Sequence, residues 1–379
     1  MAKLLMRKRK PTVSFPAELE SEKILGKFYG IYIDTTNYYN IISYLHPDNN
    51  FPEVKCIGEI FGAKPEELPT EGQLYGYFEA NELCFIDADG KKCKKEPYSL
   101  KLDIFSRNTG ILESDIMLKK GAMFIGCGSV GSLFALELAR AGVGRFLLID
   151  NDIFAYHNIS RHQCGILDVG KLKVDALKER ILQINPKAEI VTQACTVQEV
   201  PLSVFDSFCD KNTIVVGGAD NREGDLYANQ IAKEVGMPLM SVGCWERAFA
   251  GEIFYCLPTG MPDYSDLMYA IGGLSGRVNQ NKKFYTNEED LEKAIFEPGI
   301  SVDINFVTTI AVKLALDILN IDNDRYTPRL INNLSQFTLV CNTNNPKIGG
   351  DNAEIFSYPL QVTTSIEVPR APVINDSEE

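Results

Sequence analysis

From about residue 118 onward, the chain alternates short apolar runs with longer amphipathic segments. Five runs have the length of buried strands and cover residues 122–126, 145–150, 188–193, 213–218 and 238–243. Segments of helical length lie between them, at residues 132–142, 171–184 and 225–235. Because parallel strands need a crossover connection that a helix usually supplies, this alternation predicts a parallel sheet with helices on both faces.

The pattern changes after the fifth run. Residues 248–257 form a longer apolar run, which predicts an antiparallel strand, and residues 258–298 form a polar stretch of the kind found in long functional loops. A helix with one apolar face is predicted by the spacing of Ile300, Ile304, Val307, Ala311, Leu314 and Ile318. Residues 329–340 predict a closing hairpin.

The first hundred residues differ from the rest of the chain in composition and in hydrophobic pattern. Residues 13–98 are rich in Tyr, Phe and Pro, and residues 73–93 alternate apolar and polar positions around turn residues, which predicts a β-hairpin. We therefore expect three parts: a small α+β domain over residues 1–100, a Rossmann-like domain over residues 101–362, and a polar tail over residues 363–379. The Rossmann-like domain is expected to be α/β, doubly wound and mostly parallel, with an antiparallel extension. The tail is expected either to be disordered or to extend along another surface.

Composition excludes several classes of protein. The 379 residues carry a net charge of −13, which argues against a nucleic-acid partner. No apolar run reaches the length of about 18 residues that a membrane span needs. The ten cysteines form no C-x-x-C pair and there are three histidines, which disfavours zinc ligation. Single cysteines in apolar stretches fit a reducing cytoplasm better than a disulfide framework.

The sequence GCGSVG follows the first predicted strand directly. Gly126 and Gly128 permit a tight turn and a close approach of the backbone to phosphate, and Gly131 lets the next helix pack against the strand. The helix N-terminus would present unpaired N–H groups to an anion. Asp150 ends the following strand, where a carboxylate can accept hydrogen bonds from ribose. The turn predicts a nucleotide site but does not separate NAD from ATP.

The residues after Asp150 favour ATP. Arg161 and Lys173 are cations suited to the β- and γ-phosphates, and Asp220, which follows a predicted strand, is suited to Mg²⁺. Such a set fits the attack of a carboxylate on the α-phosphorus of ATP, where positioning and electrostatic stabilisation supply most of the catalysis. Singly, each has a simpler interpretation as a solvated helix charge or, for Asp220, as a helix cap.

Other polar groups in this stretch have no assigned chemistry. Asn158 lies three residues before Arg161, on the same face of a helical turn. Asp168 is expected to cap the helix that follows it. His157 and His162 are expected to be ordinary surface groups rather than pocket residues.

The ordered motifs GCGSVG, LLIDND, HNISRH, DVGKLKVDAL, INP and GGADN resemble the ThiF/MoeB/HesA adenylyltransferases, the superfamily that includes the adenylation domains of ubiquitin-activating enzymes. The resemblance is close over residues 106–242 and weaker to about residue 340. It implies that the glycine turn (Gly126, Gly128 and Gly131) holds the nucleotide, with Asp150 and Asp152 at the ribose. The remaining roles implied are phosphate contacts for Asn158, Arg161 and Lys173, Mg²⁺ binding for Asp220, and, for Arg107, a contact with the partner subunit's ATP in a homodimer.

The resemblance also implies an activity. Members of the superfamily activate the C-terminal glycine carboxylate of a ubiquitin-like or sulfur-carrier protein as an acyl-adenylate, and some relatives modify peptides or act on tRNA. The chain is most similar in character to bacterial ubiquitination-like activating enzymes, with the N-terminal domain recognising the carrier or a conjugating enzyme. Adenylation of a ribosomal peptide in natural-product maturation and tRNA modification stay open as alternatives. An NAD-dependent oxidoreductase and a non-catalytic scaffold are disfavoured by the phosphate-binding set.

Departures from the superfamily pattern bear on the expected metal content and on the expected thioester cysteine. His162 stands where many members have glutamine, and Asp263 and Asp266 stand where a first pair of zinc-binding cysteines is expected. We therefore expect ATP and Mg²⁺ but no structural zinc. The 258–298 loop contains no cysteine for a thioester, and Cys244 and Cys256 beside it are expected to be buried core thiols.

Overall fold

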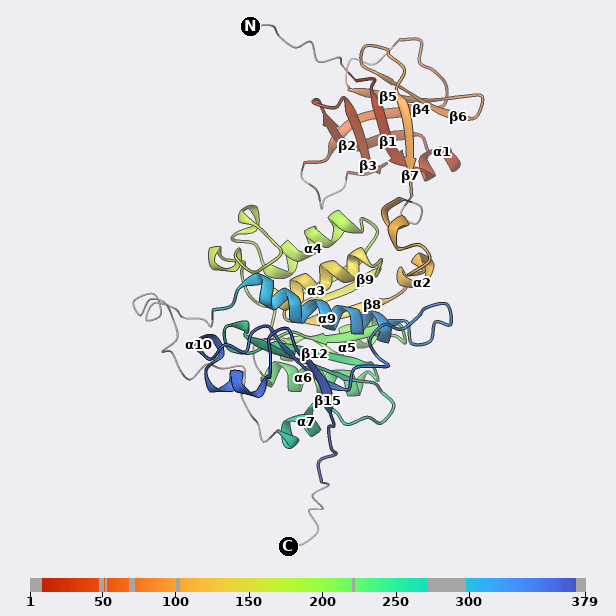
Figure 1. The fold of residues 1–379 in the computed structure, drawn as a ribbon. Helices are drawn as coiled ribbons and strands as arrows, with labels where there is room; N and C mark the ends of the chain where they lie inside the picture. The colour runs from red at the N-terminus through yellow and green to blue at the C-terminus, as the bar shows by residue number, and fades with distance from the viewer. Residues whose placement is uncertain are drawn as a thin grey trace, which may run out of the picture. The chain divides into compact units, whose positions relative to one another are not determined.

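The structure is a computed structural model that describes residues 9–47, 51, 53–67, 72–99, 103–219, 222–271 and 298–372. The chain divides into two compact units, Met1–Arg107 and Asn108–Glu379 (Figure 1). Each unit has its own hydrophobic core, so the two are described separately.

The N-terminal unit is a seven-stranded mixed sheet in the order β6-β5-β4-β2-β3-β1-β7. The helix α1 (Glu18–Ser21) is the one α-helix among its described residues. Its strands are β1 (Thr12–Pro16), β2 (Gly26–Ile33), β3 (Tyr38–Tyr44), β4 (Lys55–Phe61), β5 (Leu74–Glu79), β6 (Glu82–Asp87) and β7 (Lys94–Tyr98). The predicted hairpin is β5–β6, and it turns at Ala80 and Asn81, both of which have positive φ as a tight two-residue turn requires.

The C-terminal unit contains an eight-stranded sheet in the order β10-β9-β8-β11-β12-β13-β14-β15. The first five strands in this order are parallel, and the last three run antiparallel to their neighbours. The strands are β8 (Gly121–Ile125), β9 (Arg145–Ile149), β10 (Glu189–Gln193), β11 (Thr213–Gly217), β12 (Leu239–Cys244), β13 (Ala250–Cys256), β14 (Phe337–Cys341) and β15 (Val362–Ile366). The expected doubly wound sheet with an antiparallel extension is confirmed.

Helices cover both faces of this sheet, as Figure 1 shows. The α-helices are α2 (Ser114–Met117), α3 (Ser129–Arg140), α4 (Lys173–Ile184), α5 (Leu202–Phe208), α6 (Arg222–Glu234), α7 (Tyr264–Ala270), α9 (Ser301–Leu319) and α10 (Pro346–Gly349). Phe124 on β8 packs with α3, α4 and α9, whereas its neighbours Met123 and Ile125 pack with α5, α6 and α7. Alternate residues of one strand therefore pack into the hydrophobic cores on opposite faces of the sheet, which is why the strands are apolar throughout.

Short 3₁₀ turns connect several of these elements. They are η2 (Ser106–Asn108), η3 (Tyr156–Asn158), η4 (Ile166–Asp168), η5 (Val197–Glu199), η6 (Glu246–Ala248) and η8 (Gly350–Ile355). Within the described ranges, no helix is both long and apolar enough to traverse a bilayer.

Two predictions about the last third of the chain have different outcomes. The apolar helix over residues 300–318 is confirmed as α9. The closing hairpin over residues 329–340 is wrong: β14 begins at Phe337 and pairs with β13 on one side and with β15 on the other. Residues 363–366 of the expected polar tail thus complete the sheet as part of β15.

The helix α3 packs directly onto the turn that follows β8. A Cβ atom added to Gly131 would lie 2.1 Å from the carbonyl oxygen of Gly126, which is far inside van der Waals contact. A Cβ added to Gly128 would meet no atom within 4 Å. The two glycines therefore serve different ends: Gly131 permits packing, and Gly128 leaves space open.

Gly131→Ala is expected to lower the free energy of unfolding by about 2 kcal/mol or more, because the added methyl group overpacks the turn. Gly128→Ala is the matched control and should cost less than about 1 kcal/mol. Urea unfolding followed by the fluorescence of Trp245, the single tryptophan of the chain, reports on this unit. Equal destabilisation by both substitutions would contradict this account of the packing.

Candidate functional site

A cavity of about 400 Å³ opens at the carboxyl ends of β8, β9 and β11. Ligands bind at this edge in open parallel sheets, since the loops that follow the strands converge there. The wall is formed by residues 125, 126, 128–130, 149–152, 173, 195–198, 218, 219, 223 and 224. It therefore combines the glycine turn, the end of β9 and the first residue of α4.

The glycine turn shapes one side of this cavity. Gly126 has φ +97°, and a Cβ there would lie 3.0 Å from the oxygen of Gly218, so the turn fits closely between two strands. Gly128 precedes α3, whose N-terminus has no side-chain cap. Ser129 and Val130 of the first helical turn line the cavity. Because the first amides of a helix lack intrahelical acceptors, this end of the cavity is suited to phosphate.

Asp150 organises the turn from the neighbouring strand. Its Oδ2 accepts a hydrogen bond from the Cys127 amide at 2.7 Å, and its Oδ1 accepts one from the Asp152 amide at 2.8 Å. Both Asp150 and Asp152 line the cavity. A carboxylate placed by two backbone amides is fixed in orientation before any ligand arrives.

Lys173 brings a positive charge to the cavity wall. Its Nζ lies 2.6 Å from Oδ2 of Asp152, and its side chain is 11% exposed whereas that of Asp152 is 63% exposed. The backbone reinforces this contact, because the Lys173 amide donates to the Asp152 carbonyl at 2.9 Å. A phosphate oxygen entering the cavity would compete with an exposed carboxylate for a mostly buried ammonium.

Two predicted phosphate-binding residues do not form part of the cavity wall. Asn158 lies in η3, and its Oδ1 accepts a hydrogen bond from the Ala155 amide at 2.8 Å. The amides of Arg161 and His162 donate to the Asn158 carbonyl at 3.1 and 2.9 Å. Asn158 therefore shapes the turn that carries Arg161, which is half-buried.

The other predicted site residues lie in different places. Gly131 is buried beneath the turn. Arg107 is exposed on η2 at the end of the N-terminal unit. Asp220 and most of the 258–298 loop lie outside the described residues. The structure thus gathers Gly126, Gly128, Asp150, Asp152 and Lys173 around one cavity.

The expectation that His162 is a surface group is wrong. The side chain is 7% exposed and packs against Phe154, with 4.9 Å between ring centroids. Its Nδ1 accepts a hydrogen bond from the Cys164 amide at 3.0 Å, so the proton resides on Nε2, which donates to the Cys127 carbonyl at 2.8 Å. Burial lowers the pKa of His162 to about 4. A neutral histidine therefore holds the glycine turn from the side opposite Asp150.

Asp168 does not cap α4, contrary to expectation. The N-cap position belongs to Leu172, and Asp168 instead accepts a hydrogen bond from the Gly165 amide at 2.8 Å. It also pairs with Lys171 at 3.3 Å and with Arg180 at 3.0 Å. This nearly buried carboxylate joins the 165–168 turn to the middle of α4, so it stabilises the segment between Arg161 and Lys173.

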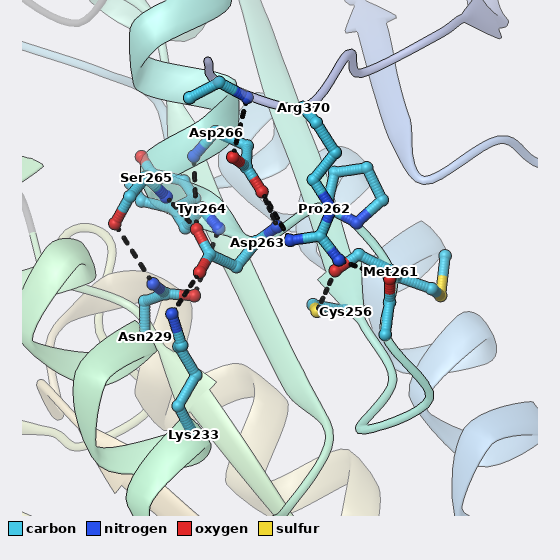
Figure 2. Close-up of polar contacts among 12 residues, drawn as sticks. Asn229, Lys233, Cys256, Met261, Pro262, Asp263, Tyr264, Ser265, Asp266 and Arg370 are labelled. Carbon is cyan, nitrogen blue, oxygen red and sulfur yellow. Dashed lines mark hydrogen bonds and ion pairs between the residues drawn. The ribbon is translucent and has the colours of Figure 1, made fainter. Parts of the chain in front are cut away.

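Asp263 and Asp266, which replace the expected cysteines, form ion pairs and hydrogen bonds with other residues of the chain (Figure 2). Asp263 caps α7 by accepting hydrogen bonds from the amides of Ser265 and Asp266 at 2.8 and 3.1 Å, and it pairs with Lys233 at 2.6 Å. Asp266 pairs with Arg370 at 3.2 Å and accepts a hydrogen bond from the Ala371 amide at 2.9 Å. One ion pair and one backbone hydrogen bond thus attach the segment after β15 to α7.

The two cysteines near this region are less buried than expected. Cys244 and Cys256 end β12 and β13, and both are half-buried. The Cys256 thiol lies beside the carbonyl groups of Leu257 and Met261, and burial raises the pKa of Cys256 to about 11. A thiol in this state is a poor nucleophile at neutral pH.

The family of the chain follows from a comparison of its sequence with known families. The model of the ThiF family matches residues 110–349, which is more than half of the chain and includes every wall of the cavity. The chain belongs to the ThiF family. The resemblance of the glycine turn and the motifs after it is thereby confirmed at the level of the family.

Curated relatives of this ThiF-family chain match it in part. Ubiquitin-like modifier-activating enzyme 5 of Arabidopsis thaliana is 28% identical over 178 residues, which are 43% of this chain and 40% of that protein. The tRNA threonylcarbamoyladenosine dehydratase of Bacillus subtilis (strain 168) is 47% identical over 68 residues, which are 18% of this chain and 27% of that protein. The chain therefore spans less than half the length of these relatives.

Solved structures support the same fold. The crystal structure of E. coli MccB with ATP has a TM-score of 0.50 and 16% identity, covering 72% of this chain and 73% of that chain. At this identity the likeness concerns the fold alone.

The buried His162 predicts a pH dependence of stability. The pKa of a histidine is about 6.5 in the unfolded chain, so between pH 6.5 and pH 4 the unfolded chain binds a proton that the folded protein does not. Stability should therefore fall as the pH drops from 7 to 4.5, by about 2 to 3 kcal/mol from this group. His162→Gln, which does not titrate, should lack this part of the loss.

Urea unfolding of both proteins at pH 7 and pH 4.5, followed by Trp245 fluorescence, measures the difference. Other titrating groups affect both proteins alike, so they cancel. Identical pH dependence in the two proteins would show that His162 is not held neutral in the folded state.

Proposed function

We propose that this chain adenylates the C-terminal carboxylate of a ubiquitin-like or sulfur-carrier protein, with ATP as substrate and pyrophosphate as product. The observation that carries the proposal is the joint placement of the α3 N-terminus and the Lys173 ammonium on one cavity. Membership of the ThiF family supports activation of the adenylation type, and the relative named as a ubiquitin-like modifier-activating enzyme supports a protein substrate.

The proposed reaction is a displacement at phosphorus. A carboxylate oxygen of the substrate bonds to the α-phosphorus of ATP, the bond from that phosphorus to the bridging oxygen of the β-phosphate breaks, and pyrophosphate leaves with the electron pair. Both reactants are anions, so fixed positive groups lower the barrier by balancing the charge on the departing phosphates. Lys173 and the amides of the first turn of α3 supply that charge from the cavity wall.

The remaining groups are proposed from their positions in the chain. Ala219 lines the cavity, and the next residue in the sequence is Asp220, whose carboxylate offers the oxygen ligands that Mg²⁺ prefers. Asp150 and Asp152 would accept hydrogen bonds from the ribose. Arg161 and Asn158, on the turn held by His162, would approach the phosphates from the segment before α4.

The proposal extends to assembly and location. We propose a homodimer in the cytoplasm, in which the exposed Arg107 reaches the ATP of the partner subunit. A residue that acts across a two-fold interface does so twice, once for each site. The N-terminal unit is then available for recognition of the carrier protein or of a conjugating enzyme.

Substitution of Lys173 tests the site. Lys173→Ala should weaken the binding of a fluorescent ATP analogue about tenfold or more and reduce ATP–pyrophosphate exchange about 100-fold or more, because the phosphates lose a fixed cation. Lys178→Ala is the matched control, since Lys178 lies on the same helix and does not line the cavity. It should leave both quantities within about twofold.

The exchange assay also tests the substrate. Exchange should depend on a polypeptide with a free C-terminal carboxylate and disappear when that carboxylate is amidated. Asp220→Ala should abolish exchange as well. Normal exchange in Lys173→Ala, or equal exchange with the amidated polypeptide, would refute the proposed function.

A further inference from the structure

The N-terminal unit contains a hollow of about 680 Å³ that is separate from the nucleotide cavity. It lies between the β2–β3 turn at residues 34–37 and the turn after β6 at residues 87–91, with Arg9 at its edge. This volume is within the range of pockets that hold small molecules or short peptide segments. Nothing in the proposed adenylation uses it.

Tyr39 on β3 contributes an unused polar group to the wall of this hollow. Its side chain is 6% exposed, yet its hydroxyl makes no hydrogen bond to any residue that the structure describes. A hydroxyl on the wall of a cavity that makes no hydrogen bond to the surrounding protein is available to a ligand as a donor and an acceptor. Burial raises the pKa of Tyr39, with Tyr32 and Asp87 adding to the effect, so the group stays a neutral donor and acceptor.

An aromatic surface lies beside this hydroxyl. The rings of Tyr32 and Tyr39 stack with 4.5 Å between centroids and 30° between planes. The Tyr32 hydroxyl is held by Asn37 at 3.2 Å and lies 3.4 Å from Asp34. The Tyr32 hydroxyl is therefore held in place, and the half-buried Tyr32 ring offers a flat face.

A nearly buried carboxylate completes the site. Asp87 ends β6 and is 8% exposed, and its Oδ1 accepts hydrogen bonds from the amides of Asp89 and Lys91 at 3.0 and 2.8 Å. Its Oδ2 makes no hydrogen bond to any described residue. Asp87 and Tyr39 both line the hollow.

The charges of the hollow favour a cation. Asp34, Asp87 and Asp89 face Arg9 and Lys91, and Lys91 is already paired with Asp89 at 2.9 Å. The aromatic face, the open carboxylate oxygen and the unused hydroxyl together match a planar cation that stacks and donates several hydrogen bonds. A guanidinium has this shape, whereas an ammonium is a compact point charge.

We propose that this hollow binds an arginine side chain of a polypeptide partner. The guanidinium stacks on Tyr32 and donates to Oδ2 of Asp87 and to the Tyr39 hydroxyl. The volume leaves room for the chain on either side of the arginine. The site stands apart from the proposed adenylation, so either proposal can fail without the other.

The test uses the full-length protein labelled with ¹³C at the ring ε positions of tyrosine and the peptide acetyl-Gly-Arg-Gly-amide as the probe. The Tyr32 and Tyr39 signals, assigned by substitution, should shift saturably with this peptide. The same peptide with citrulline, which is isosteric with arginine but neutral, should bind at least about tenfold more weakly. Equal binding of the two peptides, or no shift at Tyr32 and Tyr39, would overturn the proposal.

Substitutions localise the contact. Tyr39→Phe removes the hydroxyl and keeps the stacked ring, and Asp87→Asn keeps an acceptor for the two amides while removing the charge. Each should weaken binding of the arginine peptide about tenfold and leave binding of the fluorescent ATP analogue unchanged. Tyr38→Phe is the control, since the Tyr38 hydroxyl pairs with Glu96 at 3.0 Å outside the hollow. Equal weakening by Tyr38→Phe and Tyr39→Phe would also overturn the proposal.

Discussion

The backbone of Cys127 is hydrogen-bonded through both its amide and its carbonyl, and the shape of the nucleotide cavity depends on these two bonds. Its amide donates to Asp150 at 2.7 Å, and its carbonyl accepts from His162 at 2.8 Å. Asp150 directly follows β9, and His162 belongs to the segment that leads to α4, so the backbone of one residue links three elements. The glycine turn is thereby fixed before a ligand arrives, and the first amides of α3 border the cavity without having to reorganise. The electrostatic stabilisation that such fixed dipoles give is strongest where water is displaced, because the local dielectric constant is lower there.

The charges around this turn are already balanced within the protein. Lys173 pairs with the exposed Asp152, and Asp168 joins the 165–168 turn to α4 through Arg180. An incoming phosphate therefore exchanges one anionic partner of Lys173 for another, and the ammonium need not leave its buried position. The net charge of the whole chain, −13, does not prevent phosphate binding, because the local field at the cavity is set by Lys173 and the N-terminus of α3. The N-terminal unit has the opposite character in its hollow, where carboxylates and tyrosines face a cavity. One chain thus presents a site suited to anions and another suited to cations.

The sequence correctly predicted the elements that depend on hydrophobic periodicity and on local motifs. The β8-turn-α3 unit, the apolar face of α9 and the antiparallel β13 follow from residues close in the chain. Several of the errors concern partners that are distant in sequence. β14 pairs with a strand formed by residues 362–366, and Asp266 pairs with Arg370, 104 residues away. His162, which follows the polar residues Asn158, Ser160 and Arg161, was expected at the surface. The apolar Cys164 two positions later, which is buried with Phe154, was the available signal that the chain turns inward there.

A crystal structure of the protein with Mg²⁺ and a non-hydrolysable ATP analogue tests the central claim most directly. The account predicts the triphosphate at the N-terminus of α3, within hydrogen-bond distance of the Lys173 Nζ, with the Cys127 amide and carbonyl still bonded to Asp150 and His162. A nucleotide bound elsewhere, or one whose phosphates face away from Lys173 and α3, would contradict it.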